Sequence, residues 1–190
     1  MRKASFGGLA ALSLLAACGP GEPAPDPAAR RTAYFDVPGL LKAQSSRLDQ
    51  RRPVVEKQVL LRDGQLETTR VAQTDWTKEL QIFQQADINK PALRGLYAVD
   101  SVALPGGTLR RTYRRRPGTD HPVEQLSVLS QGAQVQELTA TVAQDNPLVY
   151  SAKQLEMHYQ NGLLATYRVT GVQKLILFDS VHYAVRGTVQ

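Results

Sequence analysis

Alternation of apolar and polar residues dominates the chain after residue 93, where short turn signals separate one alternating stretch from the next. Together with an earlier pair of stretches around Asp63-Gly64, this pattern predicts about ten β-strands. The strands expected after residue 93 are 96–104, 108–116, 123–130, 135–143, 148–159, 163–170, 175–178 and 181–185. Because the links between them are short, we expect an antiparallel meander, and a twisted sheet of this length tends to curl.

Two turn signals set the expected pairing of hairpins. Asn161-Gly162 is the strongest such signal in the chain, and Asp63-Gly64 belongs to the same type I′ class. A two-residue turn at Asp63-Gly64 places Leu61 opposite Leu66. Gly171 lies within a later alternating stretch and is expected to mark a β-bulge.

A first helix is expected before these strands. Asp36 can cap its start, Pro38 suits its first turn, and Pro53 requires the helix to end earlier. A helix is needed to cover the apolar face of a curved sheet. The predicted fold class is therefore α+β, a curved, half-barrel-like antiparallel meander of about ten strands with two helices packed against it.

The second expected helix runs from Asp75 to the Asn89-Lys90-Pro91 segment. Trp76, Leu80 and Phe83 recur at i, i+4 and i+7, with polar residues on the opposite side. We interpret this aromatic stripe as core packing across a sheet. The alternative interpretation is a lid that contacts lipid.

The N-terminal residues follow the pattern of a secretory signal peptide. Arg2 and Lys3 precede an apolar run from Phe6 to Ala17. This run is shorter than the roughly 20 residues that a transmembrane helix needs. It ends at Cys18, the single cysteine of the chain, and a structural thiol in an oxidising compartment would normally have a partner.

The segment Leu15-Ala16-Ala17-Cys18, followed by Gly19, resembles the lipobox of bacterial lipoproteins. The resemblance implies that the Cys18 thiol carries a diacylglyceryl group and that a lipoprotein signal peptidase cuts between Ala17 and Cys18. It also implies that an acyl group such as palmitate is added to the new amine. Two or three chains anchor a protein stably, whereas one holds it only marginally. The alternative is a plain signal peptide with a chance cysteine near its end.

The resemblance and the expected start of folded structure near Phe35 together divide the chain into three parts: a lipoprotein signal peptide at 1–17, a lipidated cysteine with a proline-rich tether at 18–34, and one antiparallel-sheet domain at 35–190. Four prolines between Pro20 and Pro27 favour an extended tether. No acidic run follows Cys18. The resemblance therefore implies a bacterial envelope protein, lipid-anchored in the outer membrane and facing the periplasm.

Composition adds few constraints. The chain is 42% hydrophobic and 21% charged, which is ordinary for a globular protein. Removing Arg2 and Lys3 with the signal peptide lowers the formal net charge from +6 to +4. This mild basicity fits a location near anionic lipid or glycan. We expect no nucleic-acid partner for an exported protein.

Five arginines crowd one expected strand and are the candidate anion-binding residues: Arg110, Arg111, Arg114, Arg115 and Arg116. Strand alternation places Arg110 and Arg114 on one face and Arg111 and Arg115 on the other. The functional interpretation is contact with a lipid phosphate or an acidic partner, since guanidinium groups bind such anions bidentately. The structural interpretation, which we favour, is a charged edge strand that blocks association between sheets.

The sequence contains no clear catalytic or metal-binding pattern. His121, His158 and His182 each lack a second ligand at metal-binding spacing, although Glu156 shares a strand face with His158. Motif strings of common enzyme classes are absent. We expect a protein that is not an enzyme and that needs neither metal nor cofactor.

Two function hypotheses remain, with an enzyme acting on glycan or peptide as a distant third. The order of elements is similar to that of half-barrel carriers and receptors of lipoprotein sorting and of lipid-binding lipoproteins, although no motif matches residue by residue. The first hypothesis is a carrier that binds a lipid or acyl chain in a groove between sheet and helix. The candidate groove residues are Trp76, Phe83, Leu155, Met157 and Tyr167. The second is a structural or interaction subunit of an envelope complex, with a filled core and no small-molecule ligand.

Overall fold

A computed structural model of the chain describes residues 34–61 and 64–190. The predicted signal peptide, the Cys18 lipidation site and nearly all of the predicted tether lie outside these described residues. No helix in the described ranges is both long enough and apolar enough to cross a bilayer.

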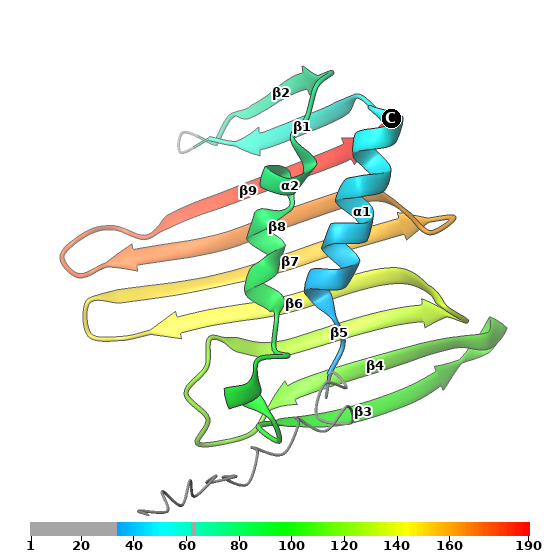
Figure 1. The fold of residues 1–190 in the computed structure, drawn as a ribbon. Coiled ribbons are helices and arrows are strands. Elements are labelled where there is room, and N and C mark those ends of the chain that lie inside the picture. Colours follow the sequence, from blue (N-terminus) through cyan, green and yellow to red (C-terminus); the bar gives the residue numbers. More distant parts are fainter. Residues whose placement is uncertain (1–33, 62–63) are drawn as a thin grey trace, which may run out of the picture. The chain divides into compact units, whose positions relative to one another are not determined.

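Within the described residues, nine antiparallel strands form one open sheet in the order β2-β1-β9-β8-β7-β6-β5-β4-β3 (Figure 1). The strands are β1 (Val55–Leu60), β2 (Leu66–Val71), β3 (Tyr97–Leu104), β4 (Thr108–Arg115), β5 (Val123–Gln131), β6 (Gln134–Asp145), β7 (Val149–Gln160), β8 (Leu163–Leu175) and β9 (Val181–Val189). The predicted meander is confirmed from β3 to β9, and the first hairpin joins it beside β9. The α+β class with an antiparallel meander is thus confirmed.

The strand count is nine because one predicted strand is absent. The alternation predicted to end at residue 170 continues to Leu175 as part of β8. Residues 175–178, expected to form a strand of their own, instead end β8 and begin the loop that leads to β9.

Two local predictions about the sheet were wrong. Leu66 pairs with Leu60 rather than Leu61, because the Leu61 N–H donates to the Gln65 carbonyl (2.8 Å) and the loop is longer than a two-residue turn. Gly171 lies in an unbroken ladder between β7 and β9 and marks no bulge. A Cβ on Gly171 would lie 2.4 Å from the hydroxyl oxygen of Tyr183, so glycine lets the tyrosine ring lie close against the strand.

The first predicted helix is confirmed as α1 (Val37–Arg51). Asp36 caps it by accepting a hydrogen bond from the Gly39 N–H at 2.9 Å. Arg52 ends it in a left-handed conformation, with φ of 49°, directly before Pro53.

The second predicted helix is shorter and tighter than expected. Asp75 caps it as predicted, but α2 covers only Trp76–Glu79 and the chain continues as the 3₁₀-helix η2 (Gln81–Ala86). Leu80, Phe83 and Ala86 are buried at three-residue intervals, which match the three residues per turn of a 3₁₀-helix. Two shorter 3₁₀ turns, η3 (Pro91–Leu93) and η4 (Pro105–Gly107), flank β3.

The helices lie side by side across one face of the sheet (Figure 1). The core forms between them and that face, where alternate strand residues such as Leu138, Leu155 and Val169 are buried. The opposite face carries polar residues, of which Thr139 and Gln154 are examples, and no described helix covers it. This one-sided arrangement accounts for the alternation read from the sequence.

Candidate functional site

The five predicted groove residues all belong to the core. Trp76, Phe83, Leu155, Met157 and Tyr167 are each at most 2% exposed. The rings of Phe83 and Tyr167 meet edge to face with their centroids 6.2 Å apart. These side chains bring η2 and α2 onto the sheet and fill the space between the two layers.

Trp76 also borders a cleft of about 440 Å³ at one end of this interface. Leu48 and Arg52 at the end of α1 face it, together with residues 72–76 at the start of α2. Asp49, Arg52 and Asp75 make much of its wall polar. The cleft is large enough for a small ligand, and its apolar lining residues are Leu48, Ala72 and Trp76, of which Leu48 and Trp76 are at most 1% exposed.

The five predicted anion-binding arginines do not form one surface. The β4 register places Arg110 and Arg114 on the face away from the helices, and Arg111 and Arg115 on the helix-covered face. Arg116 lies just beyond the end of β4, where its backbone N–H donates to the Leu96 carbonyl at 2.9 Å. Since β4 is second from the edge, the edge strand itself is β3.

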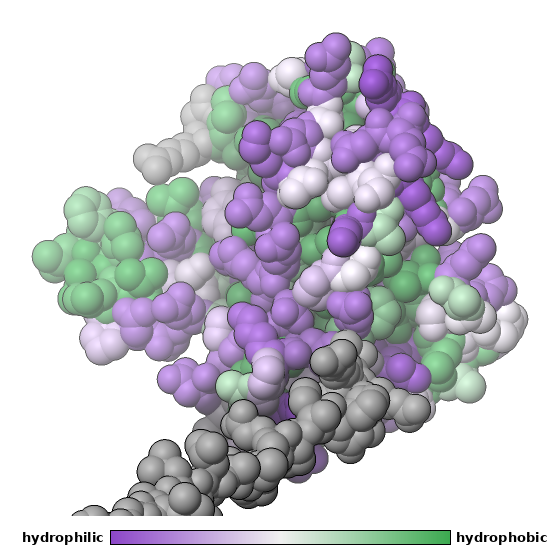
Figure 2. Space-filling view, viewed as in Figure 1, coloured by the Kyte–Doolittle hydropathy of each residue, from purple (hydrophilic) through white to green (hydrophobic). Residues whose placement is uncertain are grey.

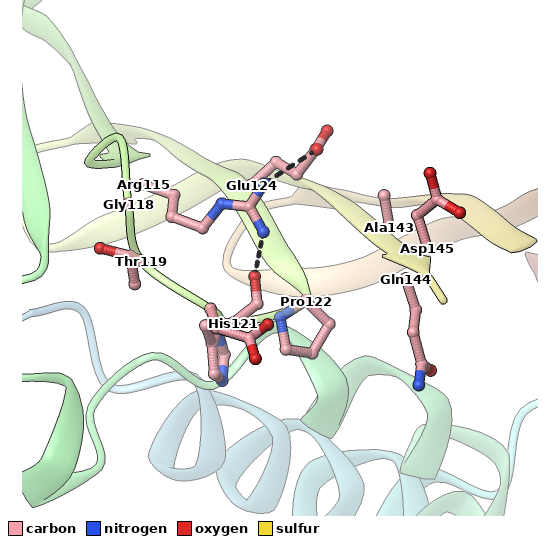
Figure 3. A pocket seen from close by; sticks show the side chains of 10 residues that line it. Arg115, Gly118, Thr119, His121, Pro122, Glu124, Ala143, Gln144 and Asp145 are labelled. Carbon is pink, nitrogen blue, oxygen red and sulfur yellow. Dashed lines mark hydrogen bonds and ion pairs between the residues drawn. The ribbon is translucent and has the colours of Figure 1, made fainter. Parts of the chain in front are cut away.

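Arg115 borders a polar cleft of about 500 Å³ at the junction of the β4–β5 connection and the end of β6 (Figure 3). Its guanidinium donates one hydrogen bond from Nη1 to the His121 carbonyl, and Nη2 lies 3.2 Å from Glu124 Oε1. Gln144 and Asp145 form the facing wall. Arg115 therefore ties the connection to β5 while leaving further N–H groups for a polar ligand.

A tyrosine–histidine pair lies behind this cleft. The Tyr97 hydroxyl donates to the Val123 carbonyl at 2.7 Å, and its oxygen is 2.8 Å from His121 Nδ1. Burial raises the pKa of Tyr97 to about 12. Burial, and then the positive charges of Lys90 and Arg115, lower the pKa of His121. Both side chains are therefore neutral near pH 7, and the pair offers polar contacts beside the cleft.

A second polar cluster, which sequence reasoning missed, joins α2 to the sheet. Glu79 Oε2 lies 2.5 Å from Lys57 Nζ on β1, and Glu79 Oε1 accepts a hydrogen bond from the Tyr167 hydroxyl on β8. Burial, and next the bond to Glu79, raise the pKa of Tyr167. The residues are far apart in sequence, so no local spacing could have revealed them.

The structure assembles no metal site from the described residues, since no three His, Cys, Asp or Glu side chains there converge. His158 pairs across strands with Glu137 on β6, with Nδ1 3.5 Å from Oε2, rather than with Glu156 on its own strand. His121 and His182 lie apart from this pair, on the β4–β5 connection and on β9.

A cluster of exposed apolar side chains lies where the β6–β7 turn meets the β8–β9 loop. We call it the apolar tip; it consists of Leu148, Tyr150, Leu175, Ile176, Leu177 and Phe178. Figure 2 shows it as a concentration of hydrophobic atoms at the left of the molecule, over the β8–β9 loop. The sequence contained a signal for this cluster, because residues 175–178 are four consecutive apolar residues without alternation.

No family model, curated protein or solved structure matches this chain.

Proposed function

We propose that this protein is a lipid-anchored envelope lipoprotein whose folded domain acts by surface contacts and does not carry lipid in its interior. The anchor is the acylated Cys18, held in the outer membrane with the domain in the periplasm. The role is non-catalytic and belongs to a structural or interaction protein of the envelope.

The filled interior carries this proposal. A carrier needs a dry groove, and the side chains that would have lined it are packed against one another with at most 2% exposure. A protein that works through its surface needs the opposite, a rigid core with binding features outside it. The apolar tip and the polar cleft at Arg115 are such features.

The anchor is tested by producing the full chain in a Gram-negative bacterium supplied with a clickable palmitate analogue. The native chain should take up the label and sediment with outer-membrane vesicles on a sucrose gradient. Cys18→Ser should lose the label and the processing step. A label that persists in Cys18→Ser, or a native chain found only in the soluble fraction, would contradict the proposal.

Acyl-chain binding is the second candidate function, and the cleft beside Leu48 and Trp76 favours it. Native mass spectrometry distinguishes the two, using a chain that begins at Gly19 and is exported by a non-lipid signal peptide. A bare monomer mass supports the surface-acting role. A bound mass of several hundred daltons, lost in Trp76→Asp or Leu155→Asp variants that still fold, would establish the carrier instead.

A further inference from the structure

We propose that the apolar tip inserts into the interfacial layer of a phospholipid bilayer, so that the folded domain touches the membrane directly. The inference deepens the proposed function, since it names the second contact that an anchored domain would make. It rests on the proposed membrane location, but its experiment does not require the acyl anchor.

The apolar tip exposes more contiguous apolar surface than the single apolar residues that are normal on a protein surface. Leu177 is 95% exposed, Phe178 68%, Leu148 65% and Ile176 55%. The β8–β9 loop extends past the helices, which leave this end of the sheet uncovered (Figure 1). A contiguous apolar cluster on a projecting loop costs solubility and marks an interaction site, and its convex form suits insertion into a fluid layer.

The backbone conformation of Leu177 also supports a contact made outside the domain. This residue adopts a left-handed conformation with φ of 69°, which glycine or asparagine takes with less strain. The Leu177 side chain is almost fully exposed, so burial of apolar surface offsets none of this backbone strain. Folding alone would thus favour glycine here, and a leucine is explained by a contact made outside the domain.

The two chain segments of the tip satisfy many of their own backbone polar groups. Ile176 N–H donates to the Leu148 carbonyl at 3.0 Å, and Phe178 N–H donates to the Leu175 carbonyl at 3.1 Å. Asn146 Oδ1 accepts from Leu148 N–H and from the next amide, at 3.0 and 2.9 Å. Internal pairing of this kind lowers the cost of moving a loop out of water, where unpaired groups are expensive.

Residues at the base of the tip suit the membrane–water interface. Tyr150 and Lys174 are opposite each other on β7 and β8, one position behind Leu175. Tyrosine rings favour the headgroup layer, and lysine extends its ammonium group toward water and phosphate. Asp179 follows Phe178 and is exposed, which limits insertion to the tip.

The sequence between the predicted lipidation site and the domain is long enough for this contact. Residues 19–33, if extended at ~3.1 Å per residue, reach about 45 Å. The longest strand, β8, has 13 residues and spans about 43 Å. A segment of that length is comparable to β8, so the sequence provides enough chain for the tip to reach the bilayer that would hold Cys18.

The experiment uses a chain that begins at Gly19, because the core residues that the structure describes, and the side chains packed against them, lie between Tyr34 and Val189. Leu177→Trp is mixed with vesicles of phosphatidylethanolamine and phosphatidylglycerol. The emission of the new tryptophan should shift to the blue, and brominated lipids should quench it. Trp76, the single native tryptophan, is 1% exposed and supplies a constant background. The matched control is Leu66→Trp, since Leu66 is 61% exposed on β2 at the far edge of the sheet.

A second variant separates membrane contact from folding. Leu177→Gly should keep or raise the Tm and yet lower the vesicle partition coefficient by about tenfold, the loss expected for one large apolar side chain. No blue shift at any lipid concentration, an equal shift in Leu66→Trp, or unchanged partitioning of Leu177→Gly would overturn the inference. A dimer in lipid-free solution that Leu177→Gly abolishes would overturn it in favour of a second copy of the chain.

Failure of this inference is distinguishable from failure of the proposed function. Loss of the palmitate label bears on Cys18 alone, and the vesicle experiment lacks that residue.

Discussion

Gly187 on β9 lies directly opposite Tyr167 on β8, and a Cβ on Gly187 would stand 2.1 Å from the ring atom Cζ of Tyr167. Glycine at this position leaves room for the tyrosine ring, whose hydroxyl then reaches Glu79 on α2. One missing side chain on the sheet thus permits the contact that ties the helix layer to it.

Gly187→Ala should therefore destabilise the protein by about 2–3 kcal/mol, the cost of overpacking a buried site. Tyr167 is 2% exposed and cannot move aside. Gly171→Ala is the matched comparison, because its neighbour Tyr183 is only partly buried and can swing toward solvent. Urea denaturation should give the larger loss for Gly187→Ala, and equal losses would contradict this account.

The ion pair between Lys57 and Glu79 should contribute measurably to stability. The two side chains are 26% and 16% exposed, so removing either leaves its partner poorly solvated. A double-mutant cycle with Lys57→Met and Glu79→Gln should give a coupling energy of about 1–3 kcal/mol. The exposed pair Arg70 and Glu56, at 3.3 Å, is the control and should give about 0.5 kcal/mol or less. Similar values for both pairs would exclude a special role for the buried one.

Leu155 tests directly whether the helix–sheet interface is filled. It is fully buried, so Leu155→Ala should cost about 2–5 kcal/mol of unfolding free energy by leaving a cavity. Leu148→Ala, at the exposed tip, should stay within about 0.5 kcal/mol of the native chain. A small loss for Leu155→Ala would indicate an open groove and would support the carrier hypothesis.

Alkaline pH should destabilise the protein through Tyr159. Burial raises the pKa of Tyr159 above its ordinary value of 10.0, and its hydroxyl donates to the sulfur of Met157 at 3.3 Å. Above pH 10 the unfolded chain loses this proton while the folded protein keeps it. The free energy of unfolding then falls with rising pH, by about 1.4 kcal/mol per pH unit for each such tyrosine.

Tyr159→Phe should remove the contribution of Tyr159 to this pH dependence. Between about pH 10 and pH 11, the free energy of unfolding of the variant should therefore rise relative to that of the native chain. Urea denaturation at a series of pH values measures the difference. Parallel pH dependences for the two proteins would show that the folded state does not hold this proton more tightly.

Local signals in the sequence determined the ends of elements and the class of fold. Asp36 and Asp75 cap helices because a side-chain oxygen pairs with an amide three residues on, and Asn161-Gly162 forms its turn because both residues tolerate positive φ. Alternation identified most of the strands, because successive residues of a strand face opposite sides of the sheet. The predicted second helix was broken because burial of Phe83 and Ala86 every third residue overrides helical propensity.

Tertiary structure alone decided what the apolar and charged residues do. The sequence could not distinguish a filled core from an open groove, since alternation is the same whether Leu155 meets a helix or a ligand. The tertiary structure brings Lys57, Glu79 and Tyr167 together from three elements. It also leaves Leu177 exposed where a strand was expected. These outcomes depend on contacts between residues distant in the chain, and local backbone preference carries no information about such contacts.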